Sequence, residues 1–227
     1  MNQTPATPLL RDEPPTLRFT PYAWAKLLHL RDAGSTEIGA FGVTDAHRLL
    51  LIEDLAVPTQ AATAVTVAFD DQAVADFFEQ QVEQGRRPRQ YARDRQHTHP
   101  GHCSSPSRVD EETFARVFGC CDWAVMFILA RGGATYARLR LGHDLNLQLP
   151  LRVEIDYAAA FPAADPVAWQ AEYDASVHAE PDEALFVADA ANADGNPPRS
   201  ARRFRSPFLH PAEDFDFGFD VDPDEEV

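Results

Sequence analysis

The chain has 227 residues, 44% of them hydrophobic, and a formal net charge of −16. This length suffices for one or two domains with a sizeable core, whereas the negative charge argues against a nucleic-acid-binding surface, because phosphate contacts need basic patches. The longest strongly apolar run, residues 123–130, is far too short to span a bilayer, which argues against a membrane protein.

The cysteines and the N-terminus indicate a cellular compartment. Cys103, Cys120 and Cys121 are an odd number and two of them are adjacent, so they do not form a disulfide framework. Residues 1–15 are rich in proline and threonine and lack the charged-then-apolar order of a signal peptide. We therefore expect a cytoplasmic protein with a disordered N-terminus.

The first half of the chain alternates strand and helix patterns. A first helix is expected from the N-cap Thr20 and Pro21 to a stop at Gly34. A second, with apolar residues on one face, covers residues 70–84 and is ended by Gly85. Strands are expected over residues 16–19, 38–43, 49–55 and 65–69.

The second half continues the alternation. Residues 111–118 predict a short helix, and the apolar run 123–130 predicts a buried central strand. Further strands are expected over 135–141 and, as edge strands, over 145–149 and 153–155, with a last helix over 166–177 that packs back on the domain. Helices alternating with mixed strands predict an α/β domain, layered helix–sheet–helix around a mixed sheet.

The composition changes after residue 177. Residues 178–227 combine a linker-like segment with an acidic stretch in which Phe215, Phe217 and Phe219 alternate with acids. Such a sequence cannot bury a core of its own. We expect a domain over residues 16–177 and a flexible acidic tail over 178–227, which is either inert or binds a partner through its aromatic residues.

Two histidines and a carboxylate mark the candidate site. His97 and His99 stand two apart, so in an extended segment both side chains lie on one face. Pro100, Gly101 and Pro106 predict a loop after them, which lets Asp110 fold back towards the histidines. Two imidazoles, one carboxylate and a fourth position left to water are typical of a catalytic zinc site.

This spacing resembles the JAMM (MPN-plus) metalloproteases over roughly residues 16–149. Their signature is an upstream Glu, then His-Ser/Thr-His-Pro, a Ser seven residues after the second His, and an Asp three residues later. This chain meets the pattern with Glu37, His97, Thr98, His99, Pro100, Ser107 and Asp110. Several positions at fixed spacing make the signature specific.

The resemblance implies an MPN-type, cytidine deaminase-like fold and a Zn²⁺ ion held by His97, His99 and Asp110. It implies Glu37 as general base and Ser107 as a donor to the oxyanion. The expected activity is isopeptide hydrolysis at the C-terminus of a ubiquitin-like protein, with its conjugates and E1- or E2-type conjugation enzymes as partners, in a bacterial pathway. Two alternatives stay open: a non-catalytic MPN scaffold acting through its tail, and a hydrolase of small amides.

The segment entering the motif, residues 91–96, departs from expectation. A central strand should be apolar, yet this one carries Arg93, Asp94, Arg95 and Gln96. Either the strand is partly exposed or the chain enters the site irregularly. Beyond the motif, His102 and Cys103 are interpreted as loop residues, because nothing in the sequence marks a reactive thiolate.

Overall fold

The computed structural model describes residues 14–142 and 147–181, so most of the expected N-terminal segment 1–15 and tail 178–227 lies outside the described residues. Four α-helices and a mixed sheet confirm the α/β class. The helices are α1 (Pro21–Ala33), α2 (Asp71–Glu83), α3 (Arg108–Phe118) and α4 (Pro166–Ser176), with a short 3-10 helix η1 (Pro88–Gln90). The strands are β1 (Thr16–Phe19), β2 (Ile38–Thr44), β3 (Leu51–Ala56), β4 (Gln60–Ala62), β5 (Val67–Phe69), β6 (Asp94–His99), β7 (Trp123–Ala130), β8 (Thr135–Leu141), β9 (Leu147–Pro150), β10 (Arg152–Ile155) and β11 (Val177–Ala179).

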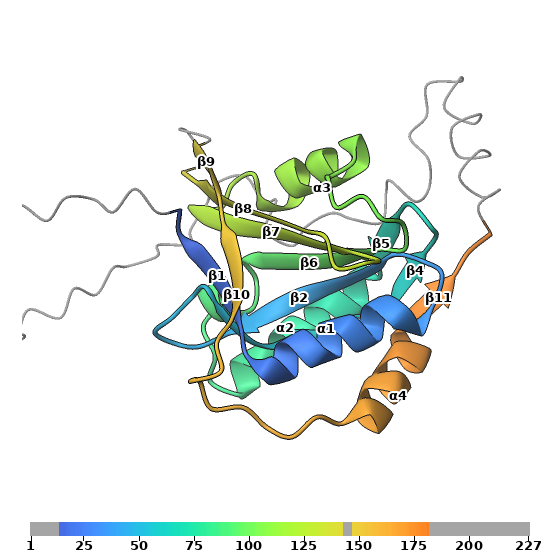
Figure 1. The fold of residues 1–227 in the computed structure, drawn as a ribbon, viewed down its shortest axis with the longest axis horizontal. Helices are drawn as coiled ribbons and strands as arrows, with labels where there is room; N and C mark the ends of the chain where they lie inside the picture. The colour runs from blue at the N-terminus through green and yellow to red at the C-terminus, as the bar shows by residue number, and fades with distance from the viewer. Residues whose placement is uncertain (1–13, 143–146, 182–227) are drawn as a thin grey trace, which may run out of the picture.

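The main sheet has eight strands in the order β10-β1-β3-β2-β6-β7-β8-β9. Only Leu151 separates β9 from β10, yet β9 pairs with β8 and β10 pairs with β1. One stretch of chain therefore joins both ends of a strongly curled sheet (Figure 1). The sequence predicts edge strands here, and this is confirmed, because β10 and β9 are the first and last strands of the order. The sequence does not indicate that these two strands, which follow each other almost directly in the chain, lie at opposite edges of the sheet.

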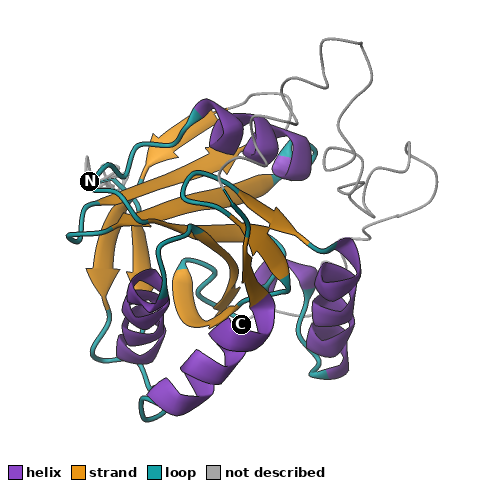
Figure 2. Cartoon of the chain, turned by 90° about the vertical axis from the view of Figure 1, so that its right-hand side faces the viewer, coloured by secondary structure: helices purple, strands orange, loops and turns teal. Residues whose placement is uncertain are grey.

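Helices cover both faces of this sheet (Figure 2). On one face, α1 buries Leu27 and Leu30 in a cluster that includes apolar residues of β2, β3 and β7. On the other face, α2 and α3 bury Phe77 and Phe114 against alternate residues of the same strands. Strand β7 is buried almost throughout, which confirms the central strand expected from its apolar run.

Helix α4 packs on the outer side of α1, as expected. The indole nitrogen of Trp169 donates a hydrogen bond of 3.1 Å to the Tyr22 hydroxyl. Lys26, the only lysine of the chain, is buried and its Nζ lies 2.6 Å from Glu172 Oε2 and 3.3 Å from Asp54 Oδ1. This amine therefore ties α1 to both α4 and β3.

A second, three-stranded sheet has the order β11-β4-β5 and lies beside the start of β2 (Figure 1). Gly39 is needed there, because a Cβ at this position would lie 2.6 Å from the Phe69 ring and 2.9 Å from Val67. Strand β11 pairs with β4 as far as Ala179, so ordered pairing continues two residues beyond residue 177. Strands β4 and β11 have three residues each, too few to show a periodic pattern in the sequence.

Strand β6 lies in the middle of the main sheet, and of the two alternatives left open for its start, exposure or an irregular entry, the structure has the irregular entry. Tyr91 to Arg93 form an irregular entry after η1, but Asp94, Arg95 and Gln96 belong to the regular strand and are buried. The polar residues are thus not exposed. They are accommodated because Gln96 donates a hydrogen bond to Asp94 on the α1 face, while Arg95 faces a carboxylate on the α3 face.

Asp94 should make stability depend on pH. Burial raises the pKa of Asp94 from 3.8 to about 7, and its Oδ2 has no hydrogen-bond partner among the described residues. The folded state binds this proton more tightly than the unfolded state does. The free energy of unfolding is therefore highest below pH 3.8, falls as the pH rises from 3.8 to about 7, and stays at its lower value above that.

We expect Asp94→Asn to raise the free energy of unfolding at pH 8 by on the order of 3 kcal/mol and to change it little near pH 4. Urea unfolding at the two pH values measures this. The exposed Asp76→Asn on α2 is the matched control and should show no such gain. An equal effect of Asp94→Asn at both pH values would contradict a buried titrating carboxyl.

In the described ranges, no helix combines the length and the apolar character needed to cross a membrane.

Candidate metal centre

Strand β6 carries the two histidines. It pairs antiparallel with β2 and parallel with β7, so its backbone is fixed on both sides. His97 and His99 alternate with Thr98 and therefore lie on the same face, the one covered by α3. The side chain of His97 is fully buried and that of His99 is 11% exposed. The predicted pair is thus presented by a rigid central strand with one imidazole near the surface.

Helix α3 supplies the carboxylate through its own N-terminal cap. Ser107 is the N-cap, and its hydroxyl accepts from the Asp110 amide at 3.1 Å. In return, Asp110 Oδ2 accepts from the Ser107 amide at 2.8 Å and from the Ser107 hydroxyl at 2.7 Å. This reciprocal capping box starts the helix and fixes the rotamer of the carboxylate at the same time. Oδ1 of Asp110 accepts no hydrogen bond from this cap and faces His97.

The three groups converge. His97 Nε2 lies 3.1 Å from His99 Nε2 and 3.2 Å from Asp110 Oδ1. His99 Nε2 lies 3.8 Å from Asp110 Oδ2. All three residues offer ligand atoms that lie within 4.8 Å of one another. The sequence prediction that these residues come together is confirmed.

These separations fit a metal ion. In a tetrahedral site with bonds of about 2.0–2.2 Å, as zinc has, neighbouring ligand atoms lie about 3.3–3.6 Å apart. His99 Nδ1 lies 2.8 Å from the Cys103 carbonyl, which can accept a hydrogen bond from Nδ1–H and thereby leave the lone pair on Nε2. The lone pair of His99 Nε2 then lies beside His97 Nε2 and the Asp110 carboxylate. A cation placed between these three groups would accept electron pairs from all of them. The group could therefore hold a metal ion.

The protonation states of His97 and Asp110 suit metal binding. Burial lowers the pKa of His97 to about 4, so this imidazole is neutral at pH 7. Burial alone would raise the pKa of Asp110, but hydrogen bonds with His97, His99 and Ser107 outweigh it and hold that pKa well below its usual range. A neutral imidazole and an ionised carboxylate are the forms that bind metals.

Glu37 lies beside these ligands although it is far from them in sequence. It precedes β2, and the register Ile38↔Thr98 brings it next to His99. Glu37 Oε1 is 3.5 Å from His99 Nε2, and its side chain is 8% exposed. Its amide donates to the Thr63 carbonyl at 2.7 Å, which anchors it to the turn between β4 and β5.

The environment of Glu37 makes it a proton acceptor near neutral pH. Burial, together with the Asp110 charge, raises the pKa of Glu37 to about 7, against the opposing effects of His99 and Arg95. A carboxylate whose pKa lies close to the working pH is well suited to general acid–base chemistry. Glu37 is not a solvated charge at a strand end, because it is buried in the site.

The other candidate residues have structural roles. His102 Nδ1 lies 3.0 Å from the Arg131 carbonyl and links the loop to the β7–β8 turn. Cys103 has an exposed side chain, and its carbonyl contacts His99. Sequence reasoning missed the role of Arg95 and of Gln60, whose buried side-chain amide pairs with both backbone groups of Gly39 and fastens β4 to β2.

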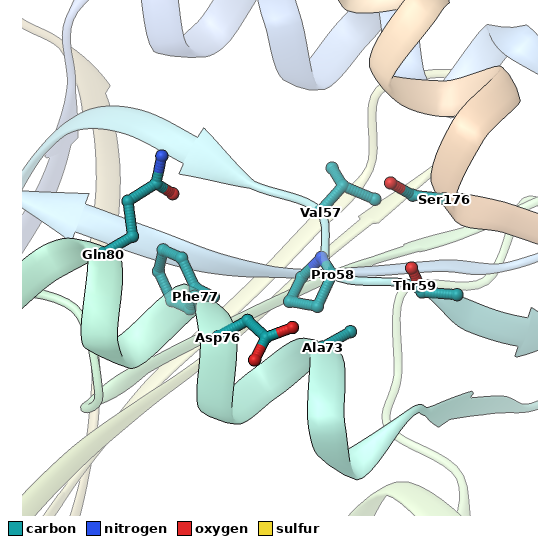
Figure 3. Close-up of a pocket in the computed structure, with 8 residues that line it drawn as sticks. All are labelled: Val57, Pro58, Thr59, Ala73, Asp76, Phe77, Gln80 and Ser176. Carbon is teal, nitrogen blue, oxygen red and sulfur yellow. The ribbon is translucent and has the colours of Figure 1, made fainter.

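A separate surface hollow of about 460 Å³ lies between α2 and the end of α4 (Figure 3). Phe77 and Asp76 of α2 line it from one side, and Pro58 and Ser176 from the other. Its lining contains none of the five site residues. We therefore assign no part of the candidate chemistry to it.

Comparison with known proteins adds no family assignment: no family model matches the chain, and no curated protein matches it in sequence.

Proposed function

We propose that this protein is a JAMM-type zinc isopeptidase with an MPN-type fold. It would remove or process a ubiquitin-like modifier at the modifier's C-terminus in a bacterial conjugation pathway. The observation that carries the proposal is that the residues of the signature, which come from the start of β2, from β6 and from the N-terminus of α3, meet at one point. The scaffold alternative gains no support, because a scaffold needs neither a complete ligand set nor a buried Glu beside it.

His97, His99 and Asp110 would hold the zinc ion. The donor set of two imidazoles and one carboxylate is that of a catalytic site, with a position left for substrate or water. When bound, zinc supplies a Lewis acid that polarises a carbonyl and lowers the pKa of water towards about 7.

Glu37 and Ser107 would carry out the proton transfers and the stabilisation of the oxyanion. Glu37 takes a proton from the attacking water and later returns it to the leaving amine, so that an amine and a carboxylic acid are released. The Ser107 hydroxyl donates a hydrogen bond to the developing oxyanion, where one such donor contributes about 3 kcal/mol. To do so it must turn from Asp110 Oδ2, its partner at 2.7 Å.

A cleavage assay tests the proposal directly. Purified protein, loaded with one equivalent of zinc, is incubated with a panel of ubiquitin-like proteins fused or conjugated to lysine through their C-termini, and with small acyl-amides. Cleavage of at least one modifier at its C-terminal glycine, abolished by chelation, supports an isopeptidase. Hydrolysis of the small amides alone would favour the small-amide alternative, and loaded protein inactive on every substrate would support a scaffold.

At saturating zinc, Ser107→Ala should lower kcat by about 100-fold with little change in KM, because the hydrogen bond to the oxyanion forms only in the transition state. Saturating zinc is needed because the same hydroxyl also holds the Asp110 carboxylate. Loss of the cap should also reduce stability by about 1 kcal/mol. Steady-state kinetics and thermal melting measure the two effects. Ser105→Ala in the same loop is the control and should leave kcat unchanged. An effect confined to KM would contradict the role in catalysis.

A further inference from the structure

Arg95 is a buried cation that lies next to Asp110, one of the three candidate metal ligands. Its side chain is only 7% exposed, and its Nη2 lies 3.8 Å from Asp110 Oδ1. Its Nη1 has no hydrogen-bond partner among the residues that the structure describes. Arg95 also interacts electrostatically with Glu37, the other carboxylate of the site.

The geometry puts this cation close to any metal ion bound by Asp110. Oδ2 of Asp110 is held by the amide and the hydroxyl of Ser107, so Oδ1 is the oxygen that remains for a metal. An ion bonded to Oδ1 at about 2.2 Å cannot lie more than about 6 Å from Arg95 Nη2, given the 3.8 Å between Nη2 and Oδ1. A divalent ion and a guanidinium would thus share one carboxylate oxygen.

The surroundings make this repulsion strong. The neighbours of Arg95 across the sheet are Phe41 on β2 and Met126 on β7, both buried and apolar. Salt and water screen the interaction far less in such a setting than at the surface. Asp110 does not depend on Arg95 for its orientation, because the Ser107 cap holds the carboxylate independently.

We propose that Arg95 sets the metal affinity of the centre. Its positive charge forms an ion pair with Asp110 in the metal-free protein and weakens the binding of a divalent cation. The inference rests on the proposed metal site. It predicts that the protein exchanges its metal readily, so that the occupancy of the site follows the supply of free metal.

The test compares two neutral variants with a charged one. Arg95→Met and Arg95→Gln remove the charge, and Arg95→Lys keeps it. Zinc dissociation constants are measured by competition with a chromophoric chelator at pH 7.5 and 0.15 M salt, and the visible spectrum of the Co²⁺-loaded proteins reports the coordination geometry. Both neutral variants should bind zinc at least tenfold more tightly than wild type with an unchanged Co²⁺ spectrum, and Arg95→Lys should stay within threefold of wild type.

Equal or weaker binding by the folded neutral variants overturns the inference, as does tighter binding by all three variants. Failure of both neutral variants to fold, with Arg95→Lys folded, also overturns it, because the charge would then serve the fold. Cleavage assays on the same samples keep the two proposals apart. If wild type binds zinc but cleaves no substrate, the proposed function fails while the dissociation constants still decide the role of Arg95.

Discussion

Glu37→Gln is expected to keep the fold and bind zinc but to lose turnover by a factor of about 10²–10⁴, the usual contribution of a general base. The amide has nearly the same shape as the carboxylate but cannot accept a proton at neutral pH. Glu37 lies 3.5 Å from His99, close to the ligands, and its carboxylate belongs to no predicted ligand set. Its loss should therefore leave the zinc content near one ion per chain.

The pH profile gives a second readout for Glu37. The base acts when it is deprotonated, so activity should rise with pH through the pKa of Glu37. Burial raises that pKa to about 7 in the metal-free protein, and a nearby dication lowers it, which places the acidic limb of kcat at or below about pH 7. This limb should disappear in Glu37→Gln.

Glu53→Gln, on the neighbouring strand β3, is the matched control and should leave both kcat and the acidic limb of its pH profile unchanged. Wild-type turnover in the Glu37→Gln protein would make Glu37 a buried charge without a catalytic role.

The double variant His97→Ala/His99→Ala should lose the metal entirely. Both imidazoles face the same point, with 3.1 Å between their Nε2 atoms, and a single remaining carboxylate cannot hold zinc at physiological concentrations. The zinc content, measured by elemental analysis, should fall from about one ion per chain to near zero. Activity in the cleavage assay should fall with it.

Thermal melting separates loss of metal from loss of fold. Zinc at 1,000 times its dissociation constant stabilises a specific site by about 4 kcal/mol, so wild type should melt at a higher temperature when zinc is added. The double variant should fold but show no such shift. His102→Ala, which removes an imidazole from the loop that follows β6, is the control and should keep both zinc and the shift. Equal zinc in the double variant and in wild type would rule out the assigned centre.

Much of the site could be predicted from the sequence because its parts are local. The alternation of a strand places His97 and His99 on one face whatever the rest of the chain does. The Ser107–Asp110 spacing is itself a capping box, so a helix that begins there orients the carboxylate without help from distant residues. The same holds for α1 and α2, whose caps Thr20 and Asp70 each accept from an amide three residues later, and for the apolar strand β7.

The rest was decided by contacts between segments far apart in the chain. Glu37 reaches His99 only through the antiparallel pairing of β2 with β6, in which Ile38 and Thr98 are 60 residues apart. The closure of the sheet by β9 and β10 depends on pairing with β8 and β1 at opposite ends of the order, which no local pattern encodes.

Arg95 shows why the sequence alone is insufficient at such a position. Hydrophobic periodicity predicts that a charge in a central strand is exposed, because burying an unpaired ion is costly. The sequence determined that β6 carries Arg95 two residues before the first histidine. Only the tertiary structure brought the N-terminus of α3 over that strand and set the Asp110 carboxylate 3.8 Å from the guanidinium, which offsets part of the cost of burying the charge.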